Sequence, residues 1–255
     1  MTTPAERFSE TAAGYAATMA PSLRPVAAEV VRRANLGQGE RVLDIGTGTG
    51  IAAAAARGDG RRITAVDAAP GMLAIARAEV EGVRFDEMDF MSLGLRDASF
   101  DVAIAVHSLL FATDRVAALA EWLRVTGPGG RLSLSVPGPT SSTPTALYSE
   151  IYERHRIDTS DRYPTQEQLA AFAQGAGWID VATDADPGIA IVLPDVAAFR
   201  TWRAIGSRGP ATDHYTAAQH DELTDEMLAV TPRTPDGTLR IPFGAIYLTA
   251  WRPPA

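Results

Sequence analysis

Cysteine is absent from the sequence, and its absence excludes several classes of protein. Without cysteine the chain cannot form disulfide bonds or thiolate zinc sites, so the secreted disulfide-rich class is excluded. Lysine is also absent, and all 23 basic residues are arginine. We interpret this second absence as a compositional bias, because no mechanism requires it.

A surplus of positive charge and a long apolar run are missing as well. The net charge is -8, whereas a nucleic-acid-binding protein needs a basic face. No run of about eighteen apolar residues is present to span a membrane, and residues 1–8 lack the apolar core of a signal peptide. We therefore expect a cytoplasmic protein with no nucleic-acid partner and no membrane span.

The remaining composition is that of an ordinary globular protein. The 255 residues are 46% hydrophobic and 21% charged, which suits one large α/β domain or two small ones. Neither an internal repeat nor a change in composition separates two parts of the chain. We therefore expect a single domain over residues 1–255.

Residues 41–50 carry the most informative pattern in the sequence. A short apolar run precedes Asp44, and glycine then occupies positions 46, 48 and 50. The alanine-rich segment 51–56 favours a helix. This order predicts a strand, a tight turn and a helix whose free N–H groups face a ligand. The pattern indicates a nucleotide-type cofactor site.

The charge of Asp44 indicates which cofactor. A dinucleotide fingerprint would place its third glycine where Ile51 stands, and Asp44 would bring a carboxylate close to the pyrophosphate. A carboxylate there suits a ligand that presents a cation. The pattern Asp-x-Gly-x-Gly-x-Gly resembles motif I of the class I S-adenosylmethionine (SAM)-dependent methyltransferases, which implies that Asp44, Gly46, Thr47 and Gly48 bind SAM. The alternative is a glycine turn that only connects a strand to a helix.

The end of the next strand fits the same resemblance. Asp67 follows a strand predicted over 62–66 and lies 23 residues after Asp44, near the spacing at which an acid meets ribose hydroxyls. The alternative role of Asp67 is a helix N-cap. The resemblance implies that Ala68 and Met72, at the start of the following helix, lie at the adenine.

A third strand, predicted over 83–88, leads to Asp89 and Phe90. Asp89 resembles the acid of the family's Gly-Asp-Ala element, which accepts a hydrogen bond from the adenine amine. Met88 stands where glycine is common, which is a departure from the family's pattern. The resemblance implies that Asp89 and the adjacent aromatic ring of Phe90 hold the adenine.

The fourth strand ends at a histidine. Residues 100–106 form the most apolar segment and predict a strand buried on both faces. His107 follows at the carboxyl end, where ligands bind to open parallel sheets. His107 is the candidate general base, because imidazole titrates near neutral pH. The alternative is a cofactor-pocket histidine that hydrogen-bonds without taking a proton.

Residues up to Asn35 predict N-terminal helices. Pro25 suits the first turn of one helix, and Phe8 and Tyr15 would share a face of an earlier one. The resemblance implies a helix over the cofactor, with Tyr15 at the methionine end of SAM. The alternative is that both aromatic residues pack on the core.

The resemblance implies an α/β fold with a doubly wound, seven-stranded, mostly parallel sheet of strand order 3-2-1-4-5-7-6. We expect the sheet core over 36–136, a helical cap over 5–35, and lid segments over 138–165 and 195–230. The further elements predicted from the pattern are a helix with apolar positions 116, 119, 120 and 123, strands over 131–136, 178–183 and 241–251, and helices over 145–156, 165–175, 195–205 and 216–230.

The implied activity is transfer of the S-methyl group of SAM to an O, N or C atom of a small metabolite, with S-adenosylhomocysteine (SAH) as product. Apolar residues in the lid segments indicate a lipophilic or aromatic acceptor, unless they belong to the core: Leu147, Tyr148, Ile151, Phe199 and Trp202. The acids of the C-terminal part form no recognisable ligand set, so we expect no required metal.

Two alternative functions remain open at this point. One is a regulatory protein that binds SAM or SAH without transferring the methyl group. The other is a nicotinamide-dependent oxidoreductase, which Asp44 and the glycine spacing disfavour. The sequence does not decide between a monomer and a homodimer.

Overall fold

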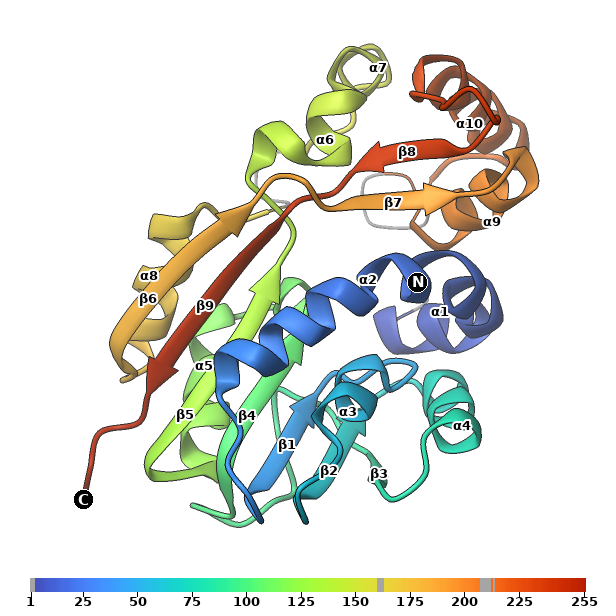
Figure 1. Cartoon of the computed structure of the whole chain (residues 1–255). Helices are drawn as coiled ribbons and strands as arrows, with labels where there is room; N and C mark the ends of the chain where they lie inside the picture. Colours follow the sequence, from blue (N-terminus) through green and yellow to red (C-terminus); the bar gives the residue numbers. More distant parts are fainter. Residues whose placement is uncertain (1–2, 160–162, 207–211, 213) are drawn as a thin grey trace.

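A seven-stranded sheet forms the centre of the molecule in the computed structural model, which describes residues 3–159, 163–206, 212 and 214–255 (Figure 1). The strand order is β3-β2-β1-β4-β5-β9-β6. The strands are β1 (Arg41–Ile45), β2 (Arg62–Asp67), β3 (Arg84–Glu87), β4 (Phe100–Val106), β5 (Thr126–Val136), β6 (Ile179–Asp186) and β9 (Ala245–Trp251). β9 runs antiparallel to both neighbours, and the pairs from β3 to β5 are parallel. Numbered along the chain within this sheet, the order is 3-2-1-4-5-7-6, which confirms the predicted fold.

The register of the parallel strands brings their carboxyl ends to one edge. Asp44 lies beside Ala65 of β2 and Ile104 of β4, while Asp67 lies beside Glu87 of β3. Neighbouring parallel strands end together, so the residues that follow them are neighbours in space although they are far apart in the sequence. The strand ends therefore assemble a candidate site.

Helices cover both faces of the sheet. The helices next to the sheet are α2 (Ala12–Ala34), α3 (Ile51–Ala56), α4 (Pro70–Glu79), α5 (Arg115–Val125) and α8 (Gln166–Gly175). α2 and α3 lie in front of the sheet in Figure 1, and α5 and α8 lie behind it. Val26 of α2 packs in one core cluster with Ile104, and Trp122 of α5 packs in another with Ala103. Successive side chains of β4 thus enter opposite cores.

The long helix α2 differs from its prediction. Pro25 lies inside it, as does Pro21, instead of beginning a helix. A proline in a helix interior removes one backbone hydrogen bond. The apolar face of α2, which includes Leu23 and Val30, is fully buried against the sheet. We infer that this burial offsets the lost bond, since tertiary packing overrides local propensity.

The other N-terminal prediction also needs correction. α1 (Pro4–Glu10) is separate from α2, with Thr11 between them. Phe8 and Tyr15 therefore lie on different helices and not on one helical face. Their rings still meet, with centroids 6.1 Å apart, because the chain turns between the two helices.

A second group of elements lies beyond the end to which β4 and β5 point (Figure 1). It consists of α6 (Pro144–Leu147), α7 (Ser149–Arg154), β7 (Ala190–Leu193), α9 (Val196–Gly206), α10 (Ala217–Val230) and β8 (Leu239–Pro242). β7 and β8 form a separate antiparallel pair. We refer to these elements as the added layer. Parts of the predicted lid segments, at 160–162, 207–211 and 213, lie outside the described residues.

The predicted strand over 241–251 is divided into β8 and β9. Phe243 and Gly244 separate the two strands, and Gly244 has a φ of 54°. A side chain at Gly244 would overlap the carbonyl oxygen of Gly138. This close approach sends β8 away from the main sheet and into the added layer, where it pairs with β7, a strand that the sequence pattern did not predict.

Several predicted elements have different limits in the structure. The helix predicted over 145–156 is interrupted at Tyr148, between α6 and α7. α5 buries Trp122 and exposes Ala120. The buried face of this helix is therefore rotated about the helix axis relative to the face predicted from positions 116, 119, 120 and 123. The predicted N-cap of α8 is confirmed, since Thr165 forms a capping box with Gln168.

Candidate cofactor site

The glycine loop after β1 uses its three glycines for different purposes. Gly46, Gly48 and Gly50 have φ values of 67°, 54° and 83°, in the region that favours glycine. A Cβ at Gly46 would overlap Cβ of Ser108, and one at Gly50 would lie 3.2 Å from Ala76. At Gly48 nothing lies within 4 Å of that position. Gly46 and Gly50 permit close packing, whereas Gly48 leaves open space for a ligand.

Asp44 is a fully buried acid with one unused oxygen. Its Oδ2 accepts a hydrogen bond of 2.6 Å from Oγ1 of Thr47. Its Oδ1 is buried and has no hydrogen-bond partner in the described part of the chain. Burial raises the pKa of Asp44 to about 7, against the opposing effects of the Thr47 hydroxyl and of the Ala53 backbone amide. A buried carboxylate with a free oxygen is a site for a cationic group, which would replace the lost solvation.

Asp67 connects the end of β2 to the glycine loop. Its Oδ2 accepts from the amide of Gly48 at 2.8 Å, and its Oδ1 accepts from the amide of Ala69 at 2.9 Å. The N-cap of α4 is Ala69, so the N-cap alternative for Asp67 is not the geometry observed. Burial raises the pKa of the Asp67 carboxyl. Each carboxylate oxygen keeps a second lone pair, so both remain able to accept from ribose hydroxyls.

The N-terminal helices cover the side of the site next to α4. Oγ of Ser9 accepts a hydrogen bond of 2.8 Å from the amide of Gly71, which attaches α1 to the start of α4. Met72 is 2% exposed and packs with Ala12. Burial, and secondly the charge of Asp67, raise the pKa of Tyr15. Tyr15 thus packs against this cluster and also lies within electrostatic reach of Asp67.

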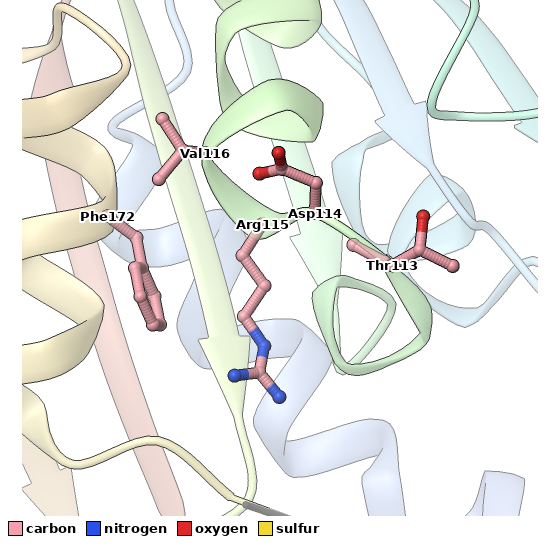
Figure 2. A pocket seen from close by; sticks show the side chains of 6 residues that line it. Thr113, Asp114, Arg115, Val116 and Phe172 are labelled. Atoms are coloured by element: carbon pink, nitrogen blue, oxygen red, sulfur yellow. The ribbon is translucent and has the colours of Figure 1, made fainter.

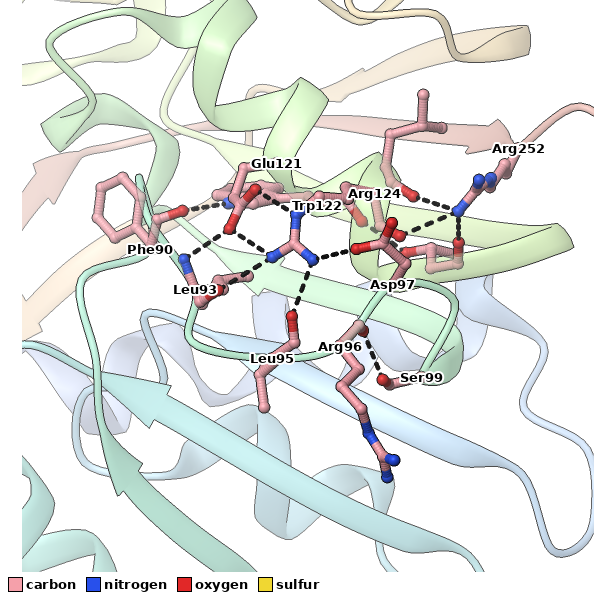
Figure 3. A network of polar contacts seen from close by, with 12 residues as sticks. Phe90, Leu93, Leu95, Arg96, Asp97, Ser99, Glu121, Trp122, Arg124 and Arg252 are labelled. Carbon is pink, nitrogen blue, oxygen red and sulfur yellow. Dashed lines mark hydrogen bonds and ion pairs between the residues drawn. The ribbon is translucent and has the colours of Figure 1, made fainter.

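The segment that carries Asp89 and Phe90 is fixed by α5 (Figure 3). The carbonyl of Phe90 accepts from Nε1 of Trp122 at 3.0 Å, and the two rings meet edge to face. Asp89 is exposed, and its Oδ1 accepts from the amide of Met91 at 2.8 Å. The ring of Phe90 therefore has a defined position, whereas the carboxylate of Asp89 is oriented by its own loop.

The same segment is also attached through Arg124 (Figure 3). Its guanidinium donates to the carbonyls of Leu95 and Leu93 at 2.8 and 3.0 Å. Glu121 accepts from Arg124 and from the amide of Leu93, at 2.8 and 2.7 Å. These bonds attach the segment after β3 to the C-terminal half of α5.

His107 adopts an unusual backbone conformation at the end of β4. Its φ is 56°, which is uncommon for a residue other than glycine. The side chain is 7% exposed, with Nδ1 3.3 Å from Oγ of Ser135 and the ring centroid 5.5 Å from that of Phe243. Burial lowers the pKa of His107 to about 4, against the smaller opposing effect of a hydrogen bond with the Ser135 backbone. The imidazole is therefore neutral at pH 7, and it is a weaker base than an exposed histidine.

Three buried polar atoms without hydrogen-bond partners, within the described residues, come from this edge of the sheet. They are Oδ1 of Asp44, Oγ1 of Thr49 and Nε2 of His107. Sequence analysis did not select Thr49, although its place between Gly48 and Gly50 was a signal for it. Buried polar atoms are normally paired, so this group indicates a polar ligand at the carboxyl edge.

A neighbouring cavity contains none of the residues selected from the sequence. It has a volume of about 350 Å³ and lies where α5 begins, against α8 (Figure 2). The lining residues are Ala112, Thr113, Asp114, Arg115, Val116 and Phe172. The guanidinium carbon of Arg115 lies 5.6 Å from the centroid of the Phe172 ring. The cavity is therefore a feature of the α5–α8 contact and not of the glycine loop.

Two further findings apply to the described residues. No cluster of three or more His, Cys, Asp or Glu side chains is arranged to hold a metal ion there. None of the helices described combines the length and apolar character needed to cross a bilayer.

Known proteins share both this sequence pattern and this fold. A family model described as a methyltransferase domain matches residues 43–134. The demethylmenaquinone methyltransferase of Thermus thermophilus is 37% identical over 163 residues, which cover 54% of this chain and 74% of that protein. The chain belongs to the family of SAM-dependent methyltransferases.

The chain has other relatives with shorter matches. The malonyl-acyl-carrier-protein O-methyltransferase of Serratia marcescens is 37% identical over 131 residues, or 51% of each chain, so the present chain spans about half its length. An O-methyltransferase of Penicillium expansum, cnsE, is 34% identical over 144 residues and 52% of each chain.

Solved structures show the same fold at low sequence identity. The (4+2)-cyclase SpnF has a TM-score of 0.61 at 24% identity, and the match covers 91% of this chain and 82% of the cyclase. Phosphoethanolamine N-methyltransferase 2 of Haemonchus contortus, in complex with S-adenosyl-L-methionine, has a TM-score of 0.58 at 19% identity. The match covers 90% of this chain and 52% of that protein. These likenesses concern the fold alone.

The residues at the carboxyl edge of this chain fit SAM. The free Oδ1 of Asp44 suits the ammonium of the methionine part, and the open space at Gly48 lets a ligand approach the backbone. Asp67 keeps lone pairs that would accept from ribose hydroxyls, and Phe90, held by Trp122, offers an aromatic ring for a base. The nicotinamide alternative fits less well, because a pyrophosphate beside Asp44 would place like charges together.

Proposed function

We propose that this chain transfers the methyl group of SAM to an O, N or C atom of a small metabolite. The observation that carries the proposal is the buried, unpaired Oδ1 of Asp44 beside the open position at Gly48. A cation at Oδ1 would satisfy the carboxylate, and SAM carries both an ammonium and a sulfonium. A site for a dinucleotide would need the opposite charge.

Each residue of the site has a proposed task in holding the cofactor. Asp44 holds the ammonium, Asp67 accepts from the ribose hydroxyls, and Phe90 with Asp89 borders the adenine. Met72 and Ala68 complete the adenine side from α4, where Met72 lies under the N-terminal helices. Tyr15 would close the methionine side from the N-terminal helices, and its place within electrostatic reach of Asp67 supports a position at the cofactor.

The bound cofactor supplies an activated methyl group on a positively charged sulfur. As the attacking atom of the acceptor forms its bond to the methyl carbon, the sulfur–carbon bond breaks and its electron pair returns to sulfur. Any proton displaced from the acceptor passes to water. The protein's own contribution is to hold the reacting atoms in line and to exclude solvent, which are effects of orientation rather than of covalent catalysis.

We further propose that the acceptor is lipophilic or aromatic. The name of one relative supports this, since the Thermus thermophilus protein is a demethylmenaquinone methyltransferase. The predicted lid residues support it less, because Tyr148 and Phe199 are fully buried in the core of the added layer. Phe243 supports it as well, because its ring lies beside His107, with the ring centroids 5.5 Å apart.

The arrangement of the segments supports a division of labour within the domain. We propose that 36–136 binds the cofactor, that 5–35 is the cap, and that 138–165 and 195–230 border the acceptor. The added layer lies beyond the carboxyl ends of β4 and β5, next to His107, which supports its place on the acceptor side (Figure 1).

Two experiments test this function. Isothermal calorimetry with SAM, SAH and NAD should show binding of the first two, and NAD binding without SAH binding would overturn the proposal. Incubation with methyl-labelled SAM and a metabolite extract should then move the label to a small molecule. Tight SAH binding with no labelled product from any extract would instead favour a regulatory protein.

A further inference from the structure

His107 is held in one orientation by its backbone. Its amide donates to the carbonyl of Ser135 at 3.0 Å, which continues the pairing of β4 with β5 by one residue beyond Val106. The positive φ of His107 then turns its side chain toward Ser135 and Phe243. The next residue, Ser108, instead donates its hydroxyl to the carbonyl of Ile45. Ser108 thus contacts the end of β1, next to the glycine loop, whereas His107 lies on the side of the added layer.

The two ring nitrogens of His107 have different surroundings. Nδ1 lies 3.3 Å from Oγ of Ser135, and Nε2 is buried with no hydrogen-bond partner in the described part of the structure. Ser135 is fully buried, and Nδ1 is the acceptor that its hydroxyl reaches within the described chain. A buried hydroxyl proton without a partner is destabilising. Donation of the Ser135 hydroxyl to Nδ1 would give this proton a partner, and the tautomer of His107 then depends on that direction.

The protonation of the ring follows from that bond. A nitrogen that accepts a hydrogen bond carries no proton, so with Nδ1 as the acceptor the neutral imidazole has its proton on Nε2. Burial lowers the pKa of His107 to about 4, so the ring stays neutral at pH 7. The unpaired Nε2 is then a hydrogen-bond donor, and a donor cannot remove a proton from the acceptor.

We propose that Ser135 fixes His107 as the Nε2–H tautomer, and that His107 donates a hydrogen bond to a carbonyl or phenolate oxygen of the methyl acceptor. Ser135 is a positioning residue, because it acts through His107. The inference rests on the proposed function, because it takes the ligand that meets His107 to be the methyl acceptor. A hydrogen bond from Nε2–H limits the methyl acceptor to molecules with an oxygen lone pair at the reacting atom or beside it. In this proposal His107 acts as a hydrogen-bond donor and not as a general base.

The tautomer can be measured without cofactor or substrate. Long-range proton–nitrogen correlation spectra of histidine-labelled protein at pH 7 distinguish the two neutral tautomers. The His107 signals are assigned by their loss in His107→Gln or, if that variant does not fold, by elimination through single substitutions of His155, His214 and His220. We expect the Nε2–H pattern for His107. The Nδ1–H pattern would overturn the proposal.

Two serine variants separate positioning from general structure. Ser135→Ala should shift His107 toward a mixture of tautomers. Ser133→Ala is the matched control, since Ser133 is also buried in β5 but its hydroxyl donates to Val30, 2.8 Å away. It should leave the His107 spectrum unchanged. Unaltered His107 signals in Ser135→Ala would remove Ser135 from the proposed role.

A pair of probes tests the oxygen acceptor. With SAH present, 2-naphthol should move the Nε2–H proton signal of His107 downfield, while naphthalene, which lacks the oxygen, should not. Equal effects of the two probes, or no effect of 2-naphthol, would overturn the acceptor part of the inference. SAH binding itself is scored separately by calorimetry, so failure of the cofactor site and failure of the His107 role are distinguishable.

Discussion

Replacing Asp44 by asparagine should make the free protein more stable while weakening cofactor binding. Burial raises the pKa of Asp44 from 3.8 to about 7. A shift of about three units corresponds to roughly 4 kcal/mol against the ionised, folded form at pH 8. Asparagine has nearly the same shape, keeps an oxygen for the Thr47 hydroxyl and carries no charge. Its buried NH₂ group lacks a partner, which costs about 1–3 kcal/mol.

The net expectation for Asp44→Asn is a gain of about 1–3 kcal/mol in the free energy of unfolding at pH 8. The sign of this change in the free energy of unfolding depends on pH. The folded-state pKa of Asp44 is raised, so the wild-type carboxyl disfavours folding only above its unfolded pKa, and the penalty grows from about pH 4 to pH 7. The gain should therefore shrink as the pH falls, disappear between about pH 4.5 and pH 6, and become a loss of about 1–3 kcal/mol near pH 4, where only the cost of the unpaired amide remains.

Cofactor binding should change in the opposite direction. A hydrogen bond to a charged group contributes about 1.5–3 kcal/mol, so Asp44→Asn should raise the Kd of SAM about 10- to 150-fold. In the wild type, protonation of Asp44 competes with binding of a cation. The affinity should therefore fall about tenfold for each pH unit below 7, and this dependence should be absent in the variant.

Urea unfolding and calorimetry at several pH values measure both effects. Asp101→Asn is a suitable control, because Asp101 lies on the adjacent strand but pairs with Arg41 at the opposite end of the sheet. It should leave the Kd of SAM and its pH dependence unchanged. An Asp44→Asn variant with unaltered SAM affinity, or a loss of stability as large at pH 8 as at pH 5, would refute the reasoning.

The remaining predictions concern the loop, the ribose, the adenine side and metals. Gly46→Ala should destabilise the fold by about 2–5 kcal/mol, because the new Cβ overlaps Ser108 and φ is positive. Gly48→Ala should cost only about 1–2 kcal/mol, since nothing lies within 4 Å of its Cβ position, and it should mainly weaken SAM binding. Urea unfolding measures the stabilities and calorimetry the binding. Asp67→Asn should weaken SAM binding about 10- to 150-fold, and an unchanged Kd would remove it from the ribose site. Trp122→Phe should cost about 1–3 kcal/mol by leaving the Phe90 carbonyl unpaired, and its binding of adenosine should weaken; full retention of both would contradict the anchoring role. Methyl transfer should persist in excess EDTA, and a loss restored by magnesium would show that a metal is required.

The sequence alone determined the cofactor half of the molecule. The spacing of Asp44 and the glycines predicts strand, turn and helix from neighbouring residues, and local backbone rules are sufficient for that. Asp67 and His107 follow from the same logic, because parallel strands must end at one edge once each strand has been identified. The burial of β4 on both faces was predicted from the apolar content of 100–106 alone.

The tertiary structure decided what each of these residues does. The unpaired oxygen of Asp44, the low pKa of His107 and its contact with Ser135 depend on burial between elements distant in sequence, which no local pattern reports. The path of α2 through Pro25 and the departure of β8 from the main sheet have the same cause. Both follow from long-range packing, at the sheet face and at the Gly138–Gly244 contact, and such packing outweighs the propensity of any single segment.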